Sequence, residues 1–371
     1  MKVLYSCLSK SWGGMEMFTL TAIKMLLERK IEVELLCIRD SRIHIEANNL
    51  GLIIHPVKAG GYFHPFTIIR TALLIKKCRY DLIHTQASKD LWILVPALKF
   101  TRIGIPLFLT KQIGSFLVKK DPLHRFLYRR VNRIFAISSM IKDNVLDTCP
   151  VHEKDVSLLH NGVNARRFSP DSVNRNQVRE ESGIKQDEIV IGMLARISPG
   201  KGHEEFIQAA SVLNKKFSNL RFLIVGEASR GEDAYADSVR ELALSSGLDE
   251  NIFTGFRSDT ERILSAMDIF VFPSHSEAFG IALVEAMAME VPSVCARADG
   301  VLDIAVDGET SFFFERRNAD DLRKKIELLI SSPHERKRLG KNARKRVLEN
   351  FDLNILTDKV ITYYKGEINK S

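Results

Sequence analysis

The chain of 371 residues has no Asp-x-Asp sequence, no Cys-x-x-Cys pair and no apolar run that approaches the length of a membrane span. Asp-x-Asp is a common means of holding Mg²⁺ beside a diphosphate, so we expect no site of that kind and no metal. The five cysteines are odd in number and scattered, which argues against a disulfide framework and against a zinc site. We interpret them as buried small apolar residues.

Other absences narrow the classes of function and location. No Gly-x-Gly-x-x-Gly follows the first strand pattern of either half, which disfavours a dinucleotide oxidoreductase. No nucleic-acid-binding motif is present, so nucleic acid is not an expected partner. The sequence begins with a strand pattern and has no charged and apolar leader, and a membrane helix needs about 18 to 20 apolar residues. We therefore expect a cytoplasmic protein.

Positive charge is concentrated in the first half. Residues 1–168 hold 26 Lys and Arg against 13 Asp and Glu, the remainder holds 28 against 33, and the total is +8. The first half is therefore expected to face an anionic partner. Within residues 97–135, nine basic residues alternate with aromatic and aliphatic ones. This mixture suits a helix on an anionic membrane, here the inner face of the cytoplasmic membrane, and equally an amphipathic helix with snorkelling basic side chains.

Strand and helix patterns alternate along the chain. In the first half, strands are predicted at 3–5, 33–37, 82–84 and 107–109, with helices at 16–28 and 66–77. In the second half, strands at 189–192, 222–225, 251–253 and 269–272 alternate with helices at 204–216, 234–245 and 260–266. This order predicts two α/β units, each with a doubly wound parallel sheet.

The predicted domains are residues 1–168 and 169–352. A polar segment at 164–176 contains a proline and suits an interdomain linker, so the hinge is placed near Phe168. Helical sequence at 320–349 is followed by a final amphipathic helix within 353–371.

Two carboxylates lie eight positions apart near the end of the second strand series. Glu277 lies in the loop after a buried strand, and Glu285 lies about a turn and a half into the helix that Phe279-Gly280 opens. Backbone N–H groups at such a helix start can face an anion. Glu277 can accept hydrogen bonds from sugar hydroxyls and Glu285 from a ribose, so the pattern suits a sugar nucleotide. The alternative is a surface loop whose glutamates are merely solvated.

Basic residues follow the first strand of the second half. Arg196 and Lys201 lie five positions apart in a loop that leads into a helix, where a diphosphate fits. A solvated turn is the alternative. Gly13-Gly14 after the first strand lets the backbone approach a phosphate or an acceptor, or is simply a turn.

Together with Gly13-Gly14-Met-Glu16 and Asn161-Gly162-Val163-Asn164, these motifs resemble, over nearly the full chain, the retaining glycosyltransferases of the family 4 type. That resemblance implies the GT-B fold, in which two Rossmann-like domains enclose a cleft and the last helix crosses back to the first domain. It assigns the donor phosphates to Arg196 and Lys201, the sugar to Glu277 and the ribose to Glu285, and it places Gln86 at the anomeric centre. The other donor-binding positions that it implies are Gly13, Gly14, Gly226, Glu227, Phe256, Arg257, Ala278, Phe279, Gly280 and Ile281.

Several positions depart from the family pattern. Family members usually carry His-x-His where this chain has His84 and Gln86, and glutamine cannot become a cation. His84 is expected on the acceptor side or as a packed histidine, and Lys111 is expected to contact an acidic acceptor. Glu290 and Ser311 occupy places that are commonly glycine.

The expected function is a cytoplasmic, metal-independent, retaining glycosyltransferase without a cofactor. Its donor would be a nucleotide-diphosphate sugar, and its acceptor a cell-surface glycan or a lipid-linked glycan of lipopolysaccharide or polysaccharide synthesis. Two alternatives stay open. One is another GT-B enzyme, such as a sugar-nucleotide epimerase or a phosphorylase, and the other is a non-catalytic partner subunit that binds a nucleotide sugar.

Overall fold

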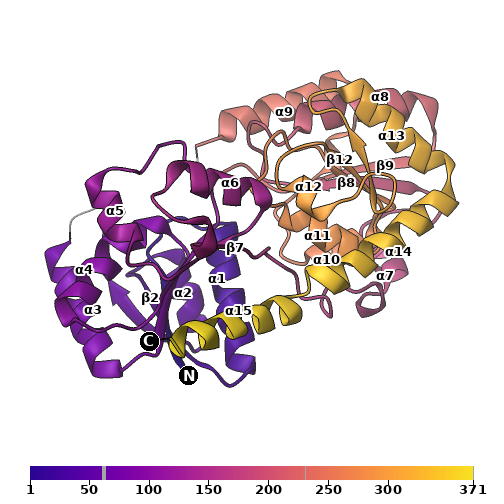
Figure 1. Cartoon of the computed structure of the whole chain (residues 1–371). Helices are drawn as coiled ribbons and strands as arrows, with labels where there is room; N and C mark the ends of the chain where they lie inside the picture. The colour runs from indigo at the N-terminus through magenta and orange to yellow at the C-terminus, as the bar shows by residue number, and fades with distance from the viewer. Residues whose placement is uncertain (61–63, 230, 371) are drawn as a thin grey trace. The chain divides into compact units, whose positions relative to one another are not determined.

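The computed structural model describes residues 1–60, 64–229 and 231–370. The chain forms two compact units (Figure 1), of which unit 1 is Met1–Asn161 with Asn354–Ser371 and unit 2 is Gly162–Leu353. The boundary between the units therefore precedes the predicted hinge at Phe168, which belongs to unit 2.

Unit 1 is built on a seven-stranded parallel sheet in the order β3-β2-β1-β4-β5-β6-β7. Its strands are β1 (Lys2–Cys7), β2 (Glu32–Ile38), β3 (Ile53–Val57), β4 (Leu82–Thr85), β5 (Leu107–Lys111), β6 (Arg133–Ala136) and β7 (Val156–Leu158). Its helices are α1 (Gly14–Glu28), α2 (Arg42–Asn49), α3 (Pro65–Cys78), α4 (Leu91–Thr101), α5 (Pro122–Tyr128), α6 (Ser139–Thr148) and α15 (Leu353–Ile368), with short 3₁₀ turns η1 (Ser88–Asp90) and η2 (Glu153–Asp155).

Burial in the core of unit 1 explains why the sequences of β1, β4 and β5 are mostly apolar. Strands in a parallel sheet are covered on both faces, and all residues of β4 and β5 are buried. The last helix contributes to this core, because Tyr364 of α15 is fully buried and its ring lies 4.9 Å from that of Phe108. Arg29 at the end of α1 holds α15 from outside, with Nε 2.5 Å from Asp358 Oδ1.

Unit 2 has a six-stranded parallel sheet in the order β10-β9-β8-β11-β12-β13. Its strands are β8 (Ile189–Leu194), β9 (Leu220–Val225), β10 (Phe253–Gly255), β11 (Ile269–Phe272), β12 (Ser293–Ala296) and β13 (Ser311–Phe314). Its helices are α7 (Arg175–Glu181), α8 (His203–Lys216), α9 (Asp233–Ser245), α10 (Thr260–Ala266), α11 (Ile281–Ala288), α12 (Val301–Ile304), α13 (Ala319–Ser331) and α14 (Pro333–Asn350), with η3 (Pro170–Ser172) and η4 (Glu250–Ile252).

Two segments differ from their prediction. The helical stretch predicted at 320–349 is divided into α13 and α14, because Pro333 has no N–H to continue the first helix and the Ser332 hydroxyl caps the second. The polar segment at 164–176 is not a free linker. Phe168 is buried, and Arg344 Nη1 donates to its carbonyl oxygen at 2.9 Å.

The cysteines are free, and all but the half-buried Cys78 are buried, which confirms their prediction as small apolar residues for four of the five. Within the described part of the chain, no helix combines the length and the apolar character needed to cross a bilayer.

Candidate functional site

Two loops meet at the carboxyl edge of the unit 2 sheet, one between β8 and α8 and the other between β11 and α11. Gly202 has φ +78°, and a Cβ there would lie 2.3 Å from the carbonyl oxygen of Pro273. The N–H of His275 donates to the carbonyl of Gly200 at 2.8 Å. Only glycine permits this close approach at Gly202, so the two loops are fixed against each other.

The pairing of these loops brings Lys201 and Glu277 together. Lys201 Nζ lies 2.7 Å from Glu277 Oε2, and each side chain is 22% exposed. A partly exposed ion pair contributes little to stability. Its effect is to place an ammonium and a carboxylate, both predicted as site residues, side by side at the sheet edge.

Arg196 lies in the same β8–α8 loop and is exposed. Its Nη1 donates to Ser229 Oγ at 2.8 Å. Ser198 is 3.2 Å from the same hydroxyl and donates a short hydrogen bond to Glu232, which holds the pKa of that carboxyl below its usual value. Ser198 belongs to the same loop as Arg196, whereas Ser229 and Glu232 lie in the loop between β9 and α9, and no local sequence motif links these two residues to Arg196.

Helix α11 begins beside this ion pair. Gly280 precedes it with φ +115°, and no side chain in the described residues caps its first turn. Of the neighbouring donor-binding predictions, Ile281 is exposed and Ala278 is half-buried. Phe279 is buried, with its ring 5.9 Å from that of Phe351, so its visible role is packing.

Glu285 is half-buried and lies about one turn into α11. The pKa of its carboxyl is raised to about 7, mainly by burial, while the charge of Arg167 lowers it and the smaller effect of the Glu261 charge raises it. Arg167 itself pairs with Glu261 at 2.7 Å. At neutral pH, Glu285 is therefore poised between its two protonation states.

The remaining residues predicted to bind the donor in unit 2 differ in their exposure and contacts. A Cβ at Gly226 would lie 1.9 Å from the carbonyl oxygen of Ala195, so packing alone requires glycine there. Glu227 and Phe256 are exposed. Arg257 makes two hydrogen bonds to the Asp259 carboxylate, at 2.8 and 2.6 Å, so its charge already has a partner.

In unit 1, neither the backbone conformation nor close packing requires glycine at positions 13 and 14. Gly13 is extended, Gly14 has a negative φ, and the atom that a Cβ at Gly13 would approach most closely is Glu16 Oε2 at 3.7 Å. The space around Gly14 is open. Both positions have room beside the backbone, and the approach of a ligand to them stays a prediction.

His84 is a packed histidine. It is 2% exposed, its Nε2 lies 2.7 Å from Thr110 Oγ1, and its Nδ1 makes a short hydrogen bond with Tyr364. Burial lowers the pKa of His84 to about 3, so the ring is neutral. Of the two readings of this residue, the structure favours the packed one.

Gln86 belongs to a buried chain of amides. Its Nε2 donates to Tyr5 Oη at 3.0 Å, its Oε1 accepts from Gln112 at 2.9 Å, and Gln112 accepts from Asn161 at 2.9 Å. Gln86 is 2% exposed, and both ends of its amide are occupied. The predicted contact of Gln86 with the transferred sugar therefore stays a prediction.

Lys111 is also buried, and its Nζ donates to Ser88 Oγ at 3.1 Å. Burial and, to a smaller extent, Lys119 lower the pKa of Lys111 to about 8. Nearby, the buried Asp90 accepts hydrogen bonds from Ser6, Thr85 and the N–H of Leu8. Asp90 ties the ends of β1 and β4 together and was missed, since a lone aspartate carries no sequence signal.

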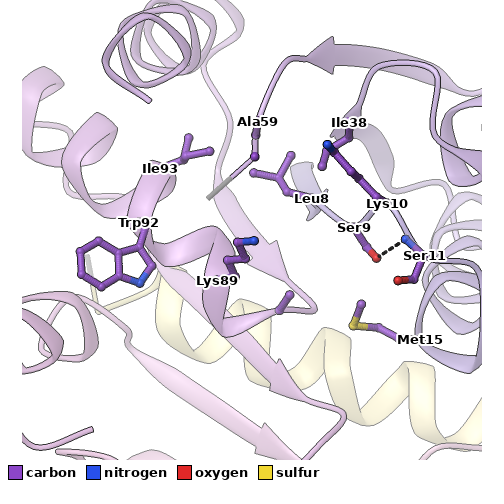
Figure 2. A pocket seen from close by; sticks show the side chains of 12 residues that line it. Leu8, Ser9, Lys10, Ser11, Met15, Ile38, Ala59, Lys89, Trp92 and Ile93 are labelled. Carbon is purple, nitrogen blue, oxygen red and sulfur yellow. Dashed lines mark hydrogen bonds between the residues drawn. The ribbon is translucent and has the colours of Figure 1, made fainter. Parts of the chain in front are cut away.

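A cavity of about 420 Å³ lies beside these strand ends in unit 1 (Figure 2). Most of its wall is apolar, and Lys10 and Lys89 are its two basic residues. Its lining comprises Leu8, Ser9, Lys10, Ser11, Met15, Ile38, Ala59, Gly60, Ala87, Lys89, Trp92 and Ile93. Among the described side chains, no group of three or more His, Cys, Asp or Glu could hold a metal ion.

Comparisons with known proteins match both units. Residues 12–167 match the family model described as Glycosyltransferase Family 4, and residues 174–346 match that described as Glycosyl transferases group 1.

Two curated relatives illustrate the similarity. One is a capsular polysaccharide biosynthesis glycosyltransferase of Staphylococcus aureus, 30% identical over 64% of this chain and 62% of its own length. The other is the N,N'-diacetylbacillosaminyl-diphospho-undecaprenol alpha-1,3-N-acetylgalactosaminyltransferase of Campylobacter jejuni. It is 26% identical over 96% of this chain and 97% of its own length.

Two solved structures share the fold. A glycosyltransferase from Rickettsia africae superposes with a TM-score of 0.89 at 23% identity, covering 100% of this chain and 99% of that one. An Anabaena protein in complex with UDP and glucose has a TM-score of 0.81 at 20% identity, covering 98% and 99%. These likenesses confirm the predicted two-domain α/β fold. Because the two family models together account for both units, the chain belongs to the family 4 glycosyltransferases and is a glycosyltransferase enzyme.

Proposed function

We propose that the protein is a retaining, metal-independent glycosyltransferase that moves a sugar from a nucleotide-diphosphate donor to a lipid-linked glycan of the cell envelope. The observation that carries the proposal is the Lys201–Glu277 pair at 2.7 Å, which joins the β8–α8 and β11–α11 loops beside the start of α11. The pair offers one charge for a diphosphate and one for sugar hydroxyls at the same place.

The leaving diphosphate would bind Lys201, Arg196 and the first N–H groups of α11. Each charge-assisted hydrogen bond contributes about 1.5 to 3 kcal/mol, and a helix end adds about 0.3 to 1 kcal/mol. These groups also stabilise negative charge as it develops on the diphosphate, which lowers the barrier to bond breaking. Glu277 then orients the sugar and Glu285 binds the ribose.

The donor is proposed to be a uridine diphosphate sugar, because a protein of the same fold is known in complex with UDP and glucose. The acceptor is proposed to be a sugar on a polyprenyl diphosphate, because a relative that matches over nearly its whole length is named for such an acceptor. The cavity of unit 1 suits an amphiphile of that kind, since apolar side chains surround Lys10 and Lys89.

One experiment tests the reaction class, the metal requirement and the stereochemistry. The purified chain is incubated with UDP-, GDP- and ADP-sugars and a lipid-diphosphate glycan acceptor, with and without EDTA, and the nucleoside diphosphate released is measured. We expect release with UDP-sugars, dependent on acceptor and unaffected by EDTA. NMR of the product should show the anomeric configuration of the donor.

Three results would contradict the proposal. Loss of activity in EDTA would show that a metal takes part, and an inverted anomer would exclude retention. Conversion of the donor to an isomer without acceptor would instead favour an epimerase.

A further inference from the structure

Three consecutive apolar side chains project from the loop between β5 and α5. Phe116 is fully exposed, Leu117 is 74% exposed and Val118 is 69% exposed. Two more exposed apolar residues, Leu123 and Phe126, follow shortly after in the sequence on α5. Single exposed apolar residues are ordinary, but three in succession in one loop, with two more on the helix that follows, indicate an interaction surface.

The loop that carries these side chains is held in shape by polar contacts on both sides of its tip. The N–H of Ser115 donates to Asn144 Oδ1 at 2.6 Å, and the Asn144 amide donates back to the Ser115 carbonyl at 3.0 Å. Beyond the tip, the N–H of Lys119 donates to the Thr148 carbonyl at 2.6 Å. Both partners lie on α6, so the apolar tip is a preformed projection.

A basic cavity of about 430 Å³ adjoins the patch between α4 and α5. Its lining is Lys99, Pro122, Arg125, Phe126, Arg129 and Arg130, with four cations and no acidic residue. The guanidinium group of Arg130 already has hydrogen-bond partners, since it donates to the carbonyls of Ile103 and Ile105. By contrast, no carboxylate of the described residues lies within ion-pair distance of Lys99, Arg125 or Arg129, and all three are exposed.

We propose that this face docks on an anionic phospholipid bilayer. Phe116, Leu117, Val118 and Leu123 enter the acyl boundary, and Lys99, Arg125 and Arg129 hold a lipid phosphate in the basic cavity. We call these seven residues the α5 surface. Unpaired cations beside exposed apolar groups complement an anionic lipid surface, which offers both negative charge and hydrocarbon.

The α5 surface lies next to the proposed acceptor cavity. Trp92 of α4 lines that cavity, and its ring lies 5.7 Å from the ring of His124 on α5 (Figure 2 shows Trp92). A chain docked through α5 would thus present its acceptor cavity near the membrane. Docking itself requires no nucleotide sugar, so the inference goes beyond the proposed reaction and can be tested without it.

The test measures binding of the full chain to vesicles by flotation, at about 0.1 M salt and without a nucleotide sugar. One set of vesicles is phosphatidylcholine alone, and the other contains phosphatidylglycerol. We expect binding only to the anionic set. Each basic side chain near such a surface strengthens binding about fivefold, so the R125Q/R129Q variant should bind about 25-fold more weakly. The F116S/L117S variant should bind at least tenfold more weakly.

Matched controls come from α3 of the same unit. The F66S/L73S variant removes two other exposed apolar side chains, and K76Q/K77Q removes two other exposed cations. Both should bind within about twofold of the unaltered chain, and the melting temperature of all four variants should be unchanged. The inference is overturned if the chain ignores anionic vesicles, or if the α3 variants lose binding while F116S/L117S keeps it. Association of the α5 surface with a protein partner but not with vesicles would overturn it equally.

Discussion

At the scale of single residues, Lys201 carries the clearest expectation. Lys201→Ala removes one charge-assisted hydrogen bond to the departing diphosphate, worth about 1.5 to 3 kcal/mol. We therefore expect kcat/KM for glycosyl transfer to fall roughly tenfold to a hundredfold, measured by release of the nucleoside diphosphate.

Lys215 provides the matched control for Lys201. It is an exposed lysine in the last turn of α8, whereas Lys201 precedes the start of the same helix. Lys215→Ala should leave kcat/KM within about twofold. Equal turnover in the two variants would show that Lys201 does not bind the donor.

Glu285 gives the chain a predicted pH dependence. Its folded pKa is about 7 against 4.5 in the unfolded chain, so the folded state binds more protons between these values. Stability should therefore fall as pH rises from about 4.5 to 7 and then level off. The shift corresponds to at most about 3.5 kcal/mol, since one pKa unit equals about 1.4 kcal/mol.

The check is a comparison of melting temperatures from pH 5 to pH 8 for the unaltered chain and for Glu285→Gln. Glutamine has the same shape and does not titrate, so the variant should melt higher than the unaltered chain at pH 8 and show a flatter pH profile. An identical profile in both chains would mean that Glu285 is ionised throughout.

At the scale of elements, we expect the packing of α15 against unit 1 to depend on the hydroxyl of Tyr364. Tyr364 is fully buried and its Oη bonds His84. Tyr364→Phe leaves the His84 nitrogen buried without that partner, which typically costs about 1 to 3 kcal/mol. Tyr363→Phe is the control, because Tyr363 is half-buried and its hydroxyl makes no hydrogen bond among the described residues. Urea unfolding should show the loss for Tyr364 alone.

The sequence predicted those elements whose signal is local. The apolar runs at 82–84 and 269–272 correspond to β4 and β11, and the helix after Phe279-Gly280 corresponds to α11. By contrast, β3 was missed because four of its five residues are not buried and one of them is Pro56. The break between α13 and α14 was missed although Ser332-Pro333 signals it, because the charge pattern continues across it.

The sequence predicted those residues of the candidate site that directly follow strands of the sheet. Lys201 and Glu277 follow neighbouring strands of a parallel sheet, β8 and β11, so their meeting follows from the topology. The hydrogen bonds of Arg196 to Ser229 and of Gln86 to Tyr5 and Gln112 depend on how separate loops and strands pack. A single sequence gives no sign of such partners.

At the scale of the whole molecule, the two units have separate hydrophobic cores, one in each sheet. The residues proposed to bind the donor diphosphate all lie in unit 2. A ligand that binds only the folded state stabilises it by about 2.7 kcal/mol at a hundred times its Kd. UDP should therefore raise the melting temperature of unit 2, which has about 190 residues, by roughly 5 to 10 °C.

The tryptophans allow the two units to be observed separately, because Trp12 and Trp92, the only two in the chain, both lie in unit 1. Tryptophan fluorescence then reports the melting of unit 1, while calorimetry reports both units. We expect UDP to shift one calorimetric transition and to leave the fluorescence transition unchanged, and Lys201→Ala should abolish most of that shift. An equal shift in both signals would instead mean that the units unfold together, and no shift in either would mean that the nucleotide does not bind.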